Sequence, residues 1–395
     1  MADERKPHIA FAHIGGADWS AGSIFYTSLF HALRSLEDSR RPKISLLVSS
    51  REDRSSYAEL SRLVDAVLEY AEPQASSSRI TRILRRIAAP VSPSVDRFLK
   101  ENNVDLLFAT SLSDQKHSLP VIGWIPDFQH VRLPEMFTQG ERDARDLHFR
   151  RLTNACSRII VTSGDVLKDL NHFAPGNNKG VIVRFAASIP PEAFEGEPAR
   201  VCQGYNLPQK FFHLPNQFWK HKNHMLVLEA LALARKTHPE ITVVCTGNLR
   251  DYRHPNYLND LLLQISKLDL RDNFIILGLV PRQDVFALMR RSLAVLQPSL
   301  FEGLSMTVQE ARMLGKTVLA ADIPVLRELA PEGTTFFDPL DSMQLAKLLV
   351  RQQSSKEPGV DRDSEELALR RAPAMVQEFA RSFMNAVDDV LLCRK

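Results

Sequence analysis

The chain of 395 residues is long enough for two or three domains with sizeable cores, and its 44% apolar and 25% charged residues exclude a disordered protein. Its net charge of +3 is too weak to indicate nucleic-acid binding. The sequence has no run of about 18 apolar residues, no metal-binding cysteine spacing and no apolar signal-peptide core at its start. We therefore expect a cytoplasmic protein without a membrane span.

Short apolar runs typical of buried strands alternate with helical patterns along nearly the whole chain. This alternation predicts parallel sheets built from βαβ units. In the first half the runs are 8–14, 44–49, 105–110, 121–125, 158–163 and 180–184. In the second half they are 211–214, 241–247, 274–278, 293–297, 317–321 and 334–338.

Proline residues mark the boundary between the two series of strands. Pro190, Pro191 and Pro198 predict an irregular interdomain linker over residues 186–209. At the carboxyl end, apolar residues at helical spacing predict a final helix. These residues are Val376, Phe379, Phe383, Val387 and Val390.

Two segments of the first half are ambiguous. Gly15 and Gly16 directly follow the first strand, but a lone glycine-rich turn is a weak signal. The spacing to Gly22 does not fit G-x-G-x-x-G, which disfavours a dinucleotide-dependent dehydrogenase.

Residues 79–87, RITRILRRI, place isoleucines on one face and arginines on the others. This segment is either a membrane-surface helix or a helix that packs inward with solvated arginines.

Residues 298–319, PSLFEGLSMTVQEARMLGKTVL, predict a strand end, a tight loop, a short helix and the next strand. The helix is expected to begin at Ser305, whose hydroxyl can cap it, and to end at Gly315. A loop–helix junction at the carboxyl end of a strand is where open α/β sheets bind ligands. Unpaired N–H groups at such a junction favour phosphate.

Two carboxylates belong to this segment, with seven residues between them. Glu302 lies in the loop and Glu310 lies inside the helix. Because carboxylates repel phosphate, hydroxyl groups are their expected partners. A ligand that carries both phosphates and hydroxyls is a nucleotide sugar. The alternative, two surface acids on an ordinary helix, is disfavoured by the flanking Phe-Glu-Gly and Gly-Lys-Thr-Val.

This segment resembles the Glu–seven–Glu motif of retaining glycosyltransferases of the GT-B fold, in particular family 4. The resemblance covers most of the chain and is strongest over residues 211–340. It implies an α/β fold with two Rossmann-like domains that face each other across a cleft. The implied boundaries are 1–187 for the acceptor-side domain and 188–374 for the nucleotide-sugar-binding domain. A C-terminal helix, 375–395, would cross back to the first domain.

The resemblance also implies roles for the residues of the motif. Glu310 would bind the ribose hydroxyls of the nucleotide, and Glu302 would lie near the donor sugar. The backbone after Glu302 would contact that sugar. This backbone belongs to Gly303, Leu304, Ser305 and Met306. Ser305 departs from the pattern, since many relatives have glycine there.

Other implied donor contacts lie at other strand ends. In HLPNQFWKHKNH, Lys222 matches a lysine that holds the diphosphate together with a helix N-terminus. Gln217 stands where relatives have arginine, and either Lys220 or His221 would have to supply the missing charge. Backbone groups would frame the base and close over the diphosphate. The residues concerned are Gly278 and Val280 for the base, and Gly15 and Gly16 for the diphosphate.

The run GWIPDFQHVRLPEMF departs from the family, in which a His-Asp pair lies near the donor sugar. This chain has Pro126 and Asp127 at that position. His130 either occupies the cleft instead or caps a loop. Asp127 is the stronger functional candidate, because an unpaired acid is costly inside a cleft.

These assignments predict a metal-independent hexosyltransferase with Glu302, Lys222, Asp127 and His130 as catalytic residues. It would transfer a sugar from a nucleotide sugar, without a cofactor, to a saccharide or lipid-linked acceptor. Polysaccharide, lipopolysaccharide or glycolipid synthesis is the expected context, and residues 79–87 would make any peripheral contact with the inner membrane face. A non-catalytic nucleotide-sugar-binding partner subunit is the alternative, which the two glutamates disfavour.

Overall fold

The computed structural model describes residues 5–14, 20–71 and 91–392. Gly15, Gly16 and the segment 79–87 lie outside these described residues, so the roles expected of them stay predictions. The chain divides into two compact units. Unit 1 is Met1–Ser188 with Ala374–Lys395, and unit 2 is Ile189–Pro373.

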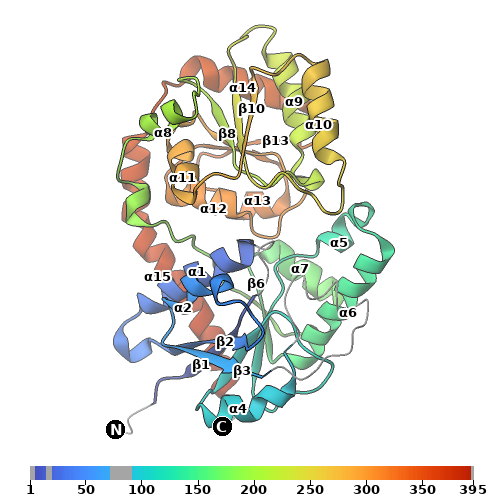
Figure 1. Ribbon diagram of the computed structural model, residues 1–395, viewed down its shortest axis with the longest axis vertical. Coiled ribbons are helices and arrows are strands. Elements are labelled where there is room, and N and C mark those ends of the chain that lie inside the picture. Colours follow the sequence, from blue (N-terminus) through green and yellow to red (C-terminus); the bar gives the residue numbers. More distant parts are fainter. Residues whose placement is uncertain (1–4, 15–19, 72–90, 393–395) are drawn as a thin grey trace. The chain divides into compact units, whose positions relative to one another are not determined.

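Unit 1 is built on a seven-stranded parallel sheet with the order β3-β2-β1-β4-β5-β6-β7. Its strands β1, β2, β3 and β6 are labelled in Figure 1. The strands are β1 (His8–Ala12), β2 (Lys43–Ser49), β3 (Ala66–Tyr70), β4 (Leu106–Ala109), β5 (Val121–Trp124), β6 (Arg158–Val161) and β7 (Gly180–Ile182). The helices are α1 (Ser20–Arg34), α2 (Ala58–Ser61), α4 (Asp96–Glu101), α5 (Gln129–Arg132), α6 (Gln139–Ala155) and α7 (Gly164–Phe173). The order reverses between β1 and β4, as in doubly wound sheets.

The final helix, α15 (Arg362–Leu392), contributes its carboxyl-terminal part to unit 1. Phe383 stacks on Phe11 of β1 with ring centroids 5.8 Å apart, and Phe11 also contacts Phe30 of α1 and Phe108 of β4. All four rings are fully buried. The apolar spacing predicted for this helix is therefore the face that completes the aromatic core of unit 1.

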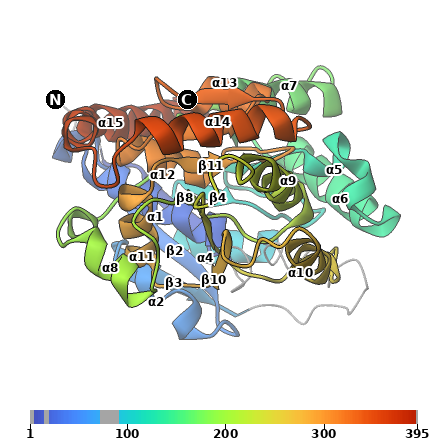
Figure 2. The same cartoon turned by 90° about the horizontal axis from the view of Figure 1, so that it is seen from above.

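Unit 2 is built on a six-stranded parallel sheet with the order β10-β9-β8-β11-β12-β13. The strands are β8 (Phe212–Leu214), β9 (Val243–Thr246), β10 (Phe274–Gly278), β11 (Val295–Gln297), β12 (Val318–Ala321) and β13 (Thr335–Phe337). The helices are α8 (Pro198–Gly204), α9 (His224–Ala234), α10 (Tyr257–Lys267), α11 (Arg282–Arg291), α12 (Met306–Met313), α13 (Pro324–Leu329) and α14 (Ser342–Ser355). Helices α9 and α14 lie side by side (Figure 2).

The structure confirms the predicted two-sheet α/β fold and every predicted strand. Strand β3 was missed, because it is an edge strand in which only Leu68 is buried, so no continuous apolar run marks it. The linker prediction was wrong in part. Within residues 186–209, Pro191 opens a short 3-10 turn and Pro198 opens α8, because proline suits the first turn of a helix.

Polar contacts bind the beginning of α15 to unit 2. Arg290 of α11 donates to both carboxylate oxygens of Glu365, at 2.7 and 2.9 Å, and to the carbonyl of Ala193 at 3.0 Å. The Lys316 ammonium donates to the Arg290 carbonyl at 3.1 Å. Burial, followed by the neighbouring Lys356 charge, lowers the pKa of Lys316 to about 7. One buried cluster thus joins α11, α15, the 3-10 turn that ends at Ala193 and the loop after α12.

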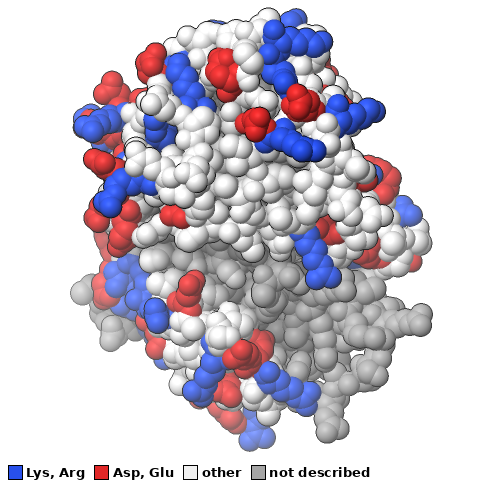
Figure 3. All heavy atoms as spheres, turned by 45° about the horizontal axis from the view of Figure 1, so that its top comes forward, with Lys and Arg blue, Asp and Glu red and all other residues white. Residues whose placement is uncertain are grey.

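The surface of the described residues carries charges of both signs. Lys and Arg side chains are interspersed with Asp and Glu over the face in view (Figure 3). Among the described helices, none has both the length and the apolar character needed to cross a membrane.

Candidate functional site

The carboxyl ends of β8 and β11 lie next to each other at the point where the strand order of unit 2 reverses. The loop after β8 contains Asn216 and Lys222, and the loop after β11 contains Glu302. Two further contacts join the loops: the Leu300 amide donates to the His221 carbonyl at 2.9 Å, and the Asn223 side chain donates to the Pro298 carbonyl at 3.1 Å. The fold therefore brings two of the predicted site segments together at a switch point, where such sheets bind ligands.

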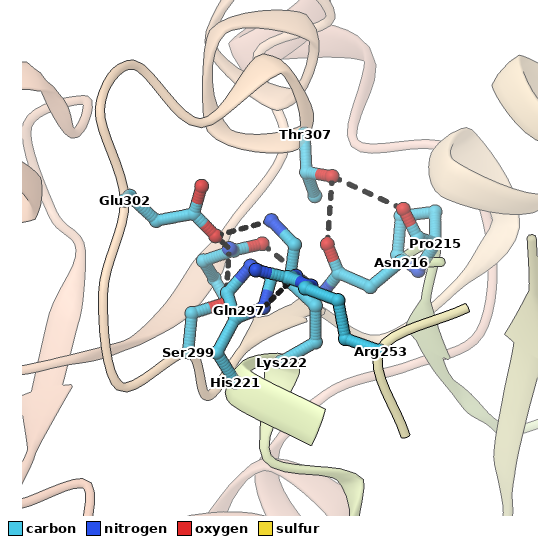
Figure 4. A network of polar contacts seen from close by, with 9 residues as sticks. All are labelled: Pro215, Asn216, His221, Lys222, Arg253, Gln297, Ser299, Glu302 and Thr307. Carbon is cyan, nitrogen blue, oxygen red and sulfur yellow. Dashed lines mark hydrogen bonds and ion pairs between the residues drawn. The ribbon is translucent and has the colours of Figure 1, made fainter. Parts of the chain in front are cut away.

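Glu302 is the centre of a buried polar network (Figure 4). Its Oε1 accepts from the Lys222 ammonium at 2.6 Å and from the Gln297 amide at 2.5 Å. Gln297 also donates to the Ser299 hydroxyl at 2.9 Å and accepts from the Asn216 amide at 3.2 Å. Both contacts of Glu302 end on the same oxygen, so its carboxylate is fixed from one side.

The same network fixes the beginning of helix α12. The Thr307 hydroxyl lies in its first turn and contacts the Pro215 carbonyl at 3.1 Å and the Asn216 side chain at 3.3 Å (Figure 4). The sequence did not predict Gln297 or Asn216 as site residues. Their signal was a polar residue at the end of an apolar strand, because a buried amide must be hydrogen-bonded.

Lys222 supplies the positive charge beside Glu302. The nearby histidines His221 and His224 are buried. Burial, followed by the charges of Lys222 and Arg253, lowers the pKa of His221 well below its usual value. Burial, followed by Lys222, lowers the pKa of His224 to about 3. Both rings are neutral near pH 7, so His221 does not replace the charge of the arginine that Gln217 stands for.

Glu310 lies inside α12 and is 3% exposed. Its Oε1 pairs with the guanidinium of Arg282, the first residue of α11, whose side chain is half-exposed. Arg282 also lies over the Phe286 ring, 4.5 Å from its centroid. Burial lowers the pKa of Arg282 to about 10, so it stays charged at neutral pH. Sequence reasoning missed Arg282, which no motif marks.

Ser305 precedes α12 in a left-handed conformation, with φ of 59°. The predicted capping bond is wrong, because its side chain makes no cap hydrogen bond, and the buried Oγ has no partner. Positive φ is unfavourable for residues other than glycine. This conformation gives a physical reason why glycine suits the position in relatives.

The loop after β9 closely approaches the loop after β8. Gly247 has φ of 142°, and a Cβ there would lie 2.4 Å from the Asn216 carbonyl oxygen. Its amide donates to the carbonyl of Gly278, which ends β10 with φ of 70°. Gly278 is buried, while Leu279 after it is 77% exposed and Val280 is half-buried. The third predicted segment thus reaches the same sheet edge.

Asp127 and His130 lie in unit 1, at the end of β5. Asp127 accepts from Arg145 at 2.8 Å and from the Gln129 amide at 2.9 Å. The buried His130 ring contacts Asp146 through Nε2 at 2.9 Å and accepts from Arg145 at Nδ1 at 3.3 Å. Burial, followed by the Arg145 charge, lowers the pKa of His130 to about 4. Both ring nitrogens are therefore occupied within unit 1, and a catalytic role for His130 stays a prediction.

Over the described part of the chain, no group of three or more His, Cys, Asp or Glu side chains could hold a metal ion. The positive groups at the switch point are Lys222 and the N–H groups that begin α12. These groups suit the phosphates of a ligand, whereas Glu302 and Glu310 suit hydroxyls.

The part of unit 2 that contains the loops after β8 and β11 matches a known protein family. Residues 201–357 match the sequence profile of the family described as glycosyl transferases group 1. The curated glycosyltransferase 1 domain-containing protein 1 of Xenopus tropicalis is 28% identical over 138 residues. This match covers 34% of the chain and 38% of that protein, so it spans well under half of the curated relative.

Solved structures resemble the chain over nearly its whole length. HepE from Anabaena, in complex with UDP and glucose, has a TM-score of 0.66 at 16% identity and covers 97% of this chain and 100% of its own. Sucrose-phosphate synthase from Thermosynechococcus elongatus has a TM-score of 0.65 at 15% identity, over 99% and 98% of the two chains. The chain has the two-domain GT-B fold, and the matched segment supports a GT-B glycosyltransferase.

Proposed function

We propose that this protein is a retaining, metal-independent glycosyltransferase. It moves a sugar from a nucleoside-diphosphate sugar to a hydroxyl of a saccharide or lipid-linked acceptor, in polysaccharide, lipopolysaccharide or glycolipid synthesis. The observation that carries the proposal is the Lys222–Glu302 pair at the switch point of unit 2, followed by α12 with Glu310.

Each end of a nucleotide sugar has suitable partners at this site. Glu310 accepts hydrogen bonds from the two ribose hydroxyls, and Glu302 accepts one from the donor sugar. Lys222 has three donors, of which Glu302 uses one, so the ammonium can also contact the diphosphate. Gln217 adds hydrogen bonding without charge. The family match and the UDP and glucose named for HepE support this arrangement.

The residues also suit the charge changes of the reaction. As the bond between the anomeric carbon and the diphosphate oxygen breaks, negative charge grows on the leaving diphosphate. Lys222 and the N–H groups at the beginning of α12 stabilise that charge in a partly buried site. The acceptor oxygen forms its bond to the same face of the anomeric carbon, and its proton passes to a phosphate oxygen.

Calorimetry against UDP, GDP, ADP and dTDP tests the binding half of the proposal, followed by hydrolysis assays with sugar derivatives of the nucleotide that binds. We expect one nucleotide to bind and its sugar derivative to be turned over. Binding of none of the four would contradict the proposal. Binding without turnover would instead favour a nucleotide-sugar-binding partner subunit, which the uncharged Gln217 would suit.

A further inference from the structure

His13 directly follows β1 in unit 1, and its amide continues the sheet by donating to the Leu47 carbonyl of β2 at 2.8 Å. Its side chain is 2% exposed. Nδ1 contacts the carboxylate of Glu52, which follows β2. The other ring nitrogen, Nε2, is buried and has no hydrogen-bond partner.

The carboxylate determines which nitrogen of the imidazole carries the proton. Because Glu52 is an acceptor, the Nδ1–H of His13 donates to it, and in the neutral imidazole Nε2 then presents a lone pair. The Tyr57 ring packs edge-on against the imidazole, with centroids 5.7 Å apart. The Tyr26 hydroxyl donates to the Ala12 carbonyl at 2.8 Å and holds the end of β1. The ring therefore has a fixed orientation and a fixed tautomer.

An unpaired buried acceptor is unfavourable, so a ligand that donates to Nε2 removes that penalty. His13 also lies where ligands are expected, since the strand order of unit 1 reverses between β1 and β4. The chemistry of the ligand is restricted. A lone pair beside the Glu52 carboxylate repels phosphate, whereas a neutral hydroxyl fits it.

We propose that His13 Nε2 accepts a hydrogen bond from a hydroxyl of the acceptor saccharide, and that Glu52 positions the ring for this contact. The proposal rests on the proposed function, because it assigns His13 to the acceptor of that reaction. His13 touches the substrate, whereas Glu52 is a positioning residue that acts through His13.

Two substitutions of His13 separate the roles of its nitrogens. In His13→Asn, the amide N–H lies near the former Nδ1, so the hydrogen bond to Glu52 can persist. The variant has no atom at the position of Nε2, so the hydrogen bond to the saccharide hydroxyl is lost. In His13→Gln, the longer side chain can return an oxygen to the position of Nε2. We expect His13→Asn to raise the KM for the acceptor about tenfold and His13→Gln to restore most of the loss. Calorimetry of nucleoside diphosphate binding to both variants checks that the donor site remains folded.

Imidazole nitrogen NMR on the full chain gives a direct readout, with methyl glycosides of glucose, galactose and mannose as probes. We expect one probe to shift the Nε2 resonance of His13 toward the protonated range, and Glu52→Gln to weaken that response. Absence of any Nε2 shift, or an equal rise in acceptor KM for His13→Asn and His13→Gln, would overturn the proposal. Failure of the proposed function is distinguishable, because the unmodified chain would then neither bind a nucleoside diphosphate nor hydrolyse a sugar nucleotide.

Discussion

Lys222 and Glu302 are 80 residues apart in the sequence and 2.6 Å apart in the structure. A cation that holds a carboxylate and faces a diphosphate has two tasks. It orients the group that contacts the sugar, and it stabilises the charge of the leaving group. In the proposed reaction, this single pair would couple recognition of the sugar to its release.

Removing Lys222 tests the second task. We expect Lys222→Ala to lower the rate by about 10²–10³, or roughly 3–4 kcal/mol, by analogy with loss of an oxyanion donor. Catalysis by the unmodified chain should persist in EDTA. Lys222→Arg should rescue only partly, because a planar guanidinium does not reproduce the position of an ammonium. The exposed Lys236→Ala is the matched control. Strict dependence on a divalent ion together with an active Lys222→Ala would contradict the mechanism.

Glu302→Gln tests recognition of the sugar. The amide oxygen can still accept from Lys222, so the loop should keep its conformation while the negative charge near the sugar is lost. We expect lower turnover with the full donor and nearly unchanged binding of the free nucleoside diphosphate. Steady-state kinetics and calorimetry measure the two quantities, and equal losses for both ligands would place Glu302 elsewhere.

Glu310→Ala should weaken binding of the nucleotide itself. Two charge-assisted hydrogen bonds to ribose are each worth about 1.5–3 kcal/mol, so the dissociation constant should rise at least about tenfold. Arg282→Leu removes the ion pair but keeps the Glu310 carboxylate, so it shows how much of the loss comes from the ion pair alone. Glu229→Ala, on the exposed face of α9, serves as the control. An unchanged dissociation constant for Glu310→Ala would refute the ribose assignment.

At the scale of elements, helix α15 is attached to unit 2 by the Arg290–Glu365 pair, with side chains 7% and 13% exposed. The neighbouring Glu366 pairs with Arg370 four residues later, but those side chains are 63% and 72% exposed. Both glutamates lie at the beginning of α15 and pair with an arginine, but the first pair is buried and reaches α11, whereas the second is exposed and lies within α15.

We expect Glu365→Ala to destabilise the protein by about 3–5 kcal/mol, because it leaves a buried guanidinium without its partner. Glu366→Ala should cost no more than about 0.5 kcal/mol. Urea unfolding measures both free energies. A double variant, Arg290→Met with Glu365→Leu, should recover part of the loss, since no buried charge remains. Similar values for the two single variants would show that burial does not decide this contact.

The elements differ in how far the sequence predicts them. The central strands were predicted because they are buried on both faces and read as continuous apolar runs, as in LLFA of β4. The edge strand β3 lacks such a run. Helix α8 was missed because its first residue, Pro198, was taken as a break in regular structure.

For the whole molecule, local motifs predicted which strand ends carry the site, but not how their side chains pair. The Glu302 and Glu310 positions follow from one continuous segment. The contacts of Glu310 with Arg282, and of Glu302 with Lys222, depend on the order of strands in the sheet. The orientation of His13 likewise depends on Glu52, 39 residues further along the chain. Tertiary pairing of this kind leaves no local pattern in one sequence.

The left-handed Ser305 has a consequence for engineering the heat resistance of this protein. Its backbone conformation costs about 1–2 kcal/mol, and its buried hydroxyl has no partner. Ser305→Gly removes both penalties and keeps the amide expected to contact the sugar, while glycine's greater freedom in the unfolded chain offsets about 0.5–1 kcal/mol. We expect the melting temperature to rise by roughly 2–4 °C, for a net gain of about 1 kcal/mol, with turnover within a few-fold of the unmodified chain. Calorimetric melting and an activity assay on the same preparation check both. Stabilising substitutions beside a binding site usually cost activity, and Ser305 is a position where a designer can raise thermal tolerance without that exchange.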